Sequence, residues 1–124
     1  MNLVGQLAAL IAGLVHVMIF GLESILFPRA AVHATFGVKA GDLQAVRPWA
    51  LNQGFYNLFL AVGALAGLIL LHSGSPEAGR ALVVLSCGSM LAAAVVLLTT
   101  NRRMLRAATV QGLAPLLALV FLFA

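Results

Sequence analysis

Two ionisable side chains, His16 and Glu23, lie within the first apolar stretch of the sequence. They are seven residues apart, so in a regular helix they differ by about 20° around the axis and are expected to share one face. Ionisable groups are costly within a membrane span, and those found there usually have a functional role. A carboxyl and an imidazole on one face could exchange a proton, or could bind a cationic or hydroxylated molecule.

A second polar group begins shortly after Trp49 and consists of amides and one phenol. Its members, Asn52, Gln53, Tyr56 and Asn57, are spaced by three and four residues, which predicts one patch about two helical turns long. The C-terminal stretch adds one further amide. The candidate ligand-binding set is therefore His16, Glu23, Asn52, Gln53, Tyr56, Asn57 and Gln111, and the candidates for catalysis are His16, Glu23 and Tyr56. The alternative reading is that the amides only join neighbouring helices.

The ligand types and spacings that mark a metal or a cofactor are missing. One His and one Glu seven residues apart, with no third nitrogen or thiolate at the same depth, do not predict a metal site. No phosphate-binding loop, nucleophile elbow or haem-attachment pattern is present, so no cofactor is predicted. The single cysteine, Cys87, lies between Ser86 and Gly88, which favours a packing face of small residues over a reactive thiol.

The composition identifies the solvent that these residues must face. The chain has 124 residues, of which 63% are hydrophobic and 8% are charged. Soluble domains average about 45–50% apolar and about 25% charged residues, and a chain this small cannot bury such an excess. We therefore expect an integral membrane protein whose partner is the lipid bilayer. The composition argues against a secreted disulfide scaffold, a nucleic-acid-binding domain and a soluble enzyme.

Four apolar runs are long enough to cross a bilayer, which takes about 20 helical residues. They cover approximately residues 3–27, 49–72, 78–100 and 104–124 and are separated by charge, Pro or Gly. The sequence thus predicts an all-α fold, a four-transmembrane-helix bundle that forms a single domain over residues 1–124.

The basic residues predict how this bundle is oriented. The first loop contains Arg29, Lys39 and Arg47, the second connection contains only Arg80, and the third loop contains the remaining three arginines. Because cytoplasmic loops are enriched in Lys and Arg, we expect the first and third loops in the cytoplasm and both termini outside. In a bacterium this corresponds to the cytoplasmic (inner) membrane.

The first loop is long enough to contain structure of its own. We expect a short helix over residues 30–36 that begins near Pro28 and ends at Gly37, and a second one from Asp42 to residue 47, before Pro48. Apolar and basic residues alternate here, which is typical of a segment lying in the cytoplasmic interface. Trp49 then marks the headgroup boundary at which the second span begins.

Most of the candidate residues are expected at a similar depth in the membrane. Glu23 is expected about one turn from the cytoplasmic boundary, with Asn57 roughly 12 Å and Gln111 roughly 10 Å from the same boundary, at 1.5 Å per residue. The outer halves of the second and fourth spans contain no strongly polar side chain. Small residues there, including Gly63 and Gly67, favour close helix packing. These features predict an inward-facing polar cavity that is closed on the outer side.

Three sequence segments together resemble a known family. They are HVMIFGLESILF (16–27), NQGFYNLFLA (52–61) and VQGLAPLLAL (110–119). The combination is similar to a bacterial family of small four-helix membrane proteins, domain of unknown function 1304. The resemblance extends over nearly the whole chain and implies the same architecture, but it implies no reaction and no ligand.

Three kinds of function fit these residues. The first is binding of a small amphipathic or cationic molecule in the cavity, with Glu23 coupling its movement to a proton; transport through so thin a bundle would require a homodimer. The second is an intramembrane enzyme in which Glu23 and His16 act as acid and base on a lipid or isoprenoid-like substrate. The third is an accessory or structural subunit whose polar patch binds a partner. The sequence favours the first.

Overall fold

The computed structural model describes residues 1–124 and is helical throughout, which confirms the all-α prediction. The longer helices are α1 (Leu3–Phe20), α3 (Leu43–His72), α4 (Pro76–Thr100) and α5 (Leu105–Val120). A π-helical turn (Gly21–Ile25) extends α1, the short α2 (Ala30–Thr35) lies in the first loop, and 3₁₀ turns (Ala40–Asp42 and Arg102–Met104) precede α3 and α5.

Three segments are long and apolar enough to cross a membrane. They are Leu3–Ile25, Ala40–His72 and Pro76–Thr100. The fourth expected span is shorter than predicted, because α5 has 16 residues and is about 24 Å long, against about 30 Å for a bilayer core. Membrane-compatible helices are therefore established, whereas a fourth crossing is not.

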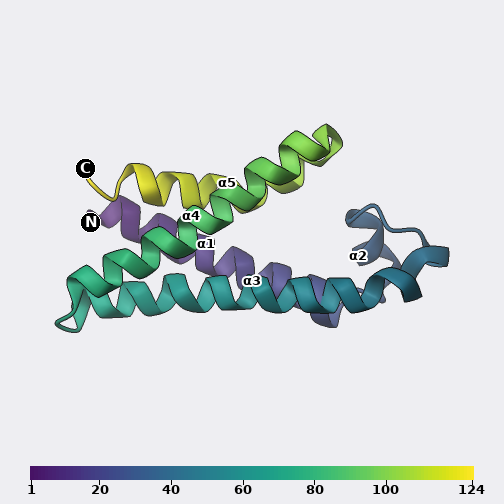
Figure 1. Ribbon diagram of the computed structural model, residues 1–124, viewed down its shortest axis with the longest axis horizontal. Helices are drawn as coiled ribbons and strands as arrows, with labels where there is room; N and C mark the ends of the chain where they lie inside the picture. The colour runs from purple at the N-terminus through teal and green to yellow at the C-terminus, as the bar shows by residue number, and fades with distance from the viewer.

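The four longer helices pack side by side in a ring. Helix α1 packs against α3 and α5, and α4 packs against the same two helices, so that α1 and α4 lie on a diagonal. Figure 1 shows both termini and the α3–α4 turn at one end, and α2 with the α4–α5 turn at the other. The two loops rich in basic residues therefore lie at the same end of the molecule, as the orientation argument requires. Hereafter we call this end the basic end.

Small residues hold the helices together in the half near the termini. A Cβ atom added to Gly67 of α3 would lie 2.8 Å from the carbonyl oxygen of Gly79 of α4, so these two backbones are in direct contact. A Cβ atom added to Gly13 of α1 would lie 3.0 Å from the Leu65 side chain of α3, so that side chain packs directly on the glycine. The core there is built mainly of alanines, together with Val83, Cys87 and Met90. Close packing around Gly63 and Gly67 thus follows the prediction, as does a buried Cys87.

Helix α3 begins earlier than expected. The sequence places the start of the span at Trp49, but the helix begins at Leu43 and continues through Pro48. Proline removes one hydrogen bond, to the carbonyl of residue 44, and Gln44 is exposed, so water can supply the missing donor. With 30 residues α3 is about 45 Å long, which exceeds a bilayer core by several turns. The helix is therefore longer than a bilayer core requires.

The first loop contains the short helix that the sequence predicts. Helix α2 ends at Thr35, and Gly37 adopts the left-handed backbone conformation (φ +73°) that ends such helices. The buried His33 then bonds through Nδ1 to the Val38 carbonyl, at 2.8 Å, and closes the turn. Asp42 lies at the start of α3, but its side chain does not cap the helix.

Candidate functional site

The π-helical turn after α1 determines how Glu23 is presented. The Leu26 amide donates to the Gly21 carbonyl at 2.9 Å, five residues back instead of four. Such a turn contains more residues than an α-helical one, so adjacent side chains diverge less, and π turns occur frequently at functional sites. As a result, the neighbours Glu23 and Ser24 both reach α3.

Glu23 meets the predicted polar patch through a single residue. The Asn57 side-chain amide donates to Glu23 Oε1 at 2.6 Å and also to the carbonyl of Gln53, at 3.2 Å. Asn57 is 7% exposed. Glu23 is half-buried, and its second carboxylate oxygen accepts no hydrogen bond from the protein. The contact therefore leaves one acceptor free at the junction of two membrane helices.

The neighbouring contact was not predicted from the sequence. Ser24 Oγ donates to the Leu51 carbonyl at 2.8 Å. A Cβ atom on Gly54 would overlap Ser24 Oγ and lie 3.0 Å from Ser24 Cβ, so the approach requires glycine at this position. The available signal is the pair of small residues, one beside Glu23 and one between Gln53 and Asn57, because small residues mark close helix contacts.

His16 and Glu23 belong to separate environments. His16 is 1% exposed, and its Nδ1 bonds to the Ala12 carbonyl of its own helix at 2.9 Å. No hydrogen bond joins it to Glu23. The regular helix on which the predicted shared face depends ends at Phe20, where the π-helical turn begins. In this structure the imidazole is a buried group of the helix interface.

The rest of the predicted patch divides around α3. At about 100° per residue, Gln53 lies about 40° from Asn57 around the helix axis, whereas Tyr56 and Asn52 lie about 100° and 140° away. Asn52, Gln53 and Tyr56 are all exposed, Tyr56 to 58%, and none of their side chains has a hydrogen-bond partner. The single patch that the spacing predicts is therefore wrong. One amide is buried and faces Glu23, and the other three polar side chains lie on the outer surface of the bundle.

Gln111 of α5 is half-buried and makes no hydrogen bond to Glu23 or Asn57. Phe20, three residues before Glu23, packs edge to face against Phe55, two residues before Asn57, with ring centroids 5.1 Å apart. This aromatic pair joins α1 to α3 about one helical turn from Glu23 along the chain.

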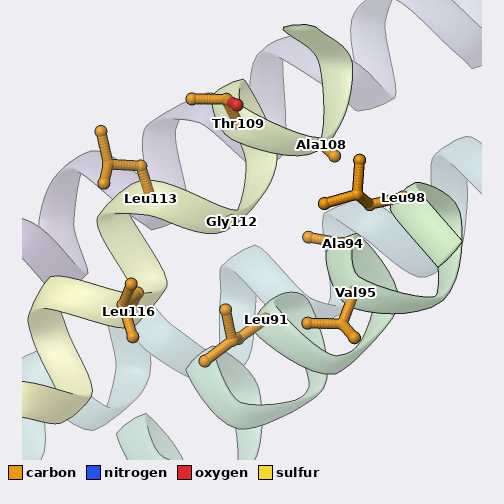
Figure 2. A pocket seen from close by; sticks show the side chains of 9 residues that line it. All are labelled: Leu91, Ala94, Val95, Leu98, Ala108, Thr109, Gly112, Leu113 and Leu116. Atoms are coloured by element: carbon orange, nitrogen blue, oxygen red, sulfur yellow. The ribbon is translucent and has the colours of Figure 1, made fainter. Parts of the chain in front are cut away.

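A hollow lies elsewhere, between α4 and α5. It has a volume of about 210 Å³, and its lining is almost entirely apolar (Figure 2). None of the predicted site residues lines it. No three His, Cys, Asp or Glu side chains come together in a group that could hold a metal ion.

Comparison with known proteins identifies the family. No curated protein and no solved structure matches the chain. A family model described as protein of unknown function (DUF1304) matches residues 10–123, a range that includes both Glu23 and Asn57. This match confirms the resemblance seen in the sequence, and the chain belongs to the DUF1304 family.

Proposed function

We propose that this chain is an integral membrane protein that binds a small cationic, amphipathic molecule through the carboxylate of Glu23. The observation that carries the proposal is the 2.6 Å hydrogen bond from Asn57 to one carboxylate oxygen, with the other oxygen left free. No Lys or Arg side chain bonds to this group. A carboxylate within a membrane span needs a partner, and a cationic ligand would supply it.

The chemistry around Glu23 favours an organic cation. An ammonium group would donate to the free oxygen, and a charge-assisted hydrogen bond of this kind is stronger than a neutral one. The Phe20–Phe55 pair, with centroids 5.1 Å apart, offers an aromatic surface one turn away for the apolar part of the ligand. Asn57 fixes the carboxylate, because its amide is itself buried and bonded to α3.

The ligand would reach Glu23 from one side of the membrane. Glu23 lies towards the basic end, which in our orientation faces the cytoplasm, so the ligand would enter from that side. Exchange of the bound cation for a proton on the carboxylate would allow proton-coupled transport. Because one chain forms only a thin wall around a path, transport would require a homodimer.

A second role, as a subunit of a membrane complex, is favoured by a different observation. Asn52, Gln53 and Tyr56 are exposed on α3 and have no partner within the chain. Amide and phenol groups at this depth are suited to hydrogen bonding with a neighbouring helix. Acid–base catalysis by His16 and Glu23 has no comparable support, because each group is bonded to a different partner.

The test is equilibrium binding to the purified protein in detergent, with hexylammonium as the cationic probe and hexanol as its neutral counterpart. We expect Glu23→Gln to weaken hexylammonium binding about 10- to 150-fold, since a hydrogen bond to a charged group contributes about 1.5–3 kcal/mol. Hexanol binding should change little. Glu77→Gln, at the opposite end, is the matched control and should leave both affinities unchanged.

Two results would contradict the proposal. The first is equal hexylammonium affinity for the wild type and a folded Glu23→Gln variant. The second is equal loss of hexylammonium and hexanol binding, which would show that the substitution disturbs the fold and not a charge interaction. For transport the probe is hexyltrimethylammonium, which is permanently charged and does not cross a bilayer unaided. Proteoliposomes with a pH gradient should accumulate it, and those with the Glu23→Gln variant should not.

A further inference from the structure

The hollow between α4 and α5 is a groove with a small-residue floor and large apolar walls. Ala94, Ala108 and Gly112 are buried and form the floor. A Cβ atom on Gly112 would lie 2.7 Å from that of Ala94, so the two helices touch here. Val95 and Leu113 are 52% and 51% exposed and stand beside the floor (Figure 2).

The groove offers hydrocarbon contacts and almost nothing else. Thr109 is its one polar lining residue, and its hydroxyl donates to the Leu105 carbonyl of the same helix at 2.8 Å. The volume of about 210 Å³ is below the range of about 300–1,000 Å³ that encloses a whole small ligand. A groove of this size and polarity fits a section of one extended acyl chain.

At the basic end the groove adjoins a second hollow of different character. Leu98 lines both, and the second hollow, of about 460 Å³, also includes Thr99, Arg102 and Leu105. Arg103 and Arg106 follow within the same turn of chain, and both are exposed. None of the three guanidinium groups forms a hydrogen bond or an ion pair within the structure. An apolar groove thus leads to Arg102, and two further unpaired arginines follow it closely in the chain.

We infer that this groove binds one acyl chain of an anionic phospholipid, whose phosphate is held by Arg102 with Arg103 and Arg106. The guanidinium fork matches phosphate oxygens and binds them in pairs. Basic pockets of this kind beside membrane helices bind anionic headgroups on the cytoplasmic side. The site is separate from Glu23 and does not depend on the function proposed for that residue.

Charge also argues against a second copy of the chain as the occupant. A twofold dimer through this groove would bring the same surface of both copies together. With both copies in the same membrane orientation, the three arginines of one copy would lie near those of the other, and like charges across an interface are unfavourable. A lipid phosphate neutralises these arginines instead.

Native mass spectrometry of the protein, released from detergent containing equimolar phosphatidylglycerol and phosphatidylcholine with identical acyl chains, tests the inference. We expect preferential retention of phosphatidylglycerol. Arg102→Gln should reduce that preference roughly fivefold, because one basic residue near an anionic surface contributes about 1 kcal/mol of binding free energy. The matched control is Arg80→Gln, at the opposite end, which should have no effect.

A second pair of variants tests the groove itself. Val95→Trp would fill it from a half-exposed position and should reduce retention of phosphatidylglycerol. The control is Val96→Trp: Val96 is 60% exposed and does not line the groove. If Val95→Trp does not fold, Leu113→Trp on the opposite wall serves the same purpose.

Four outcomes would overturn the inference. They are equal retention of the two lipids by the wild type, equal effects of Arg102→Gln and Arg80→Gln, equal effects of Val95→Trp and Val96→Trp, and loss of a dimer instead of a lipid in Val95→Trp. The last result would assign the groove to a second copy of the chain.

Discussion

Replacing Gly54 by alanine tests the contact that brings Glu23 to Asn57. The added Cβ would overlap Ser24 Oγ and lie 3.0 Å from Ser24 Cβ and 3.1 Å from the Ser24 backbone nitrogen. Overpacking of this kind costs about 1–3 kcal/mol. Alanine in a helix interior is favoured over glycine by about 0.8–1.0 kcal/mol, which offsets part of the cost. The net expectation is a loss of about 0–2 kcal/mol in the free energy of unfolding.

Two further variants separate the overlap from helix propensity. In a Ser24→Gly background the overlapping Oγ and Cβ are gone, so Gly54→Ala should be close to neutral or stabilising. The coupling between the two substitutions should then reach about 1–2 kcal/mol. Gly88 of α4 has open space where its Cβ would be, so Gly88→Ala should stabilise the protein by about 0.5–1 kcal/mol.

The free energies are measured by unfolding each variant with SDS in mixed micelles, followed by circular dichroism. Equal stabilisation of the wild type by Gly54→Ala and by Gly88→Ala would contradict the close contact at Gly54. That result would mean that the π-helical turn does not approach α3 as closely as the structure shows. Absence of coupling with Ser24 would lead to the same conclusion.

The remaining predictions concern the packing, the polar pair and the orientation. Gly67→Ala should cost at least about 1–3 kcal/mol in the same SDS assay, because its Cβ would meet the backbone of Gly79, which cannot move aside; a neutral result would contradict the close contact. Asn57→Leu should lower the free energy of unfolding by about 1–3 kcal/mol, since it leaves a half-buried carboxyl without its hydrogen-bond donor. Unchanged stability would show that this hydrogen bond does not stabilise the fold. Single cysteines at Gly41 and Arg103, in a background without the native cysteine, should both react with an impermeant thiol reagent from the cytoplasmic side; labelling of both from outside would reverse the orientation.

Much of the helical framework could be predicted from the sequence, because apolar length decides it. The helices over the first and third apolar runs, Leu3–Ile25 and Pro76–Thr100, begin and end within a few residues of those runs. The predicted helix boundary at Pro48 is wrong, because α3 begins at Leu43 and continues through the proline. Pro48 lies only five residues into the helix, where the carbonyl it leaves unpaired is exposed, so the local cost is small.

The candidate site could be predicted only in part. Residue spacing groups the four polar side chains of α3 into one patch. The face of α3 that is buried in the bundle is instead the one with the smallest side chains, and it contains Gly54, Asn57, Ala61 and Ala64. Asn57 is therefore the one patch member that meets Glu23. The π-helical turn has no sequence mark beyond Gly21, and it changes the face on which Glu23 lies.

Binding of a cation by Glu23 is tested most directly by an experimental structure of the protein with hexylammonium bound. We predict density for the ammonium nitrogen within hydrogen-bonding distance of the free Glu23 oxygen, with the Asn57 amide still bonded to the other. A well-defined probe bound elsewhere in the bundle, with no contact to the Glu23 carboxylate, would contradict cation binding by Glu23.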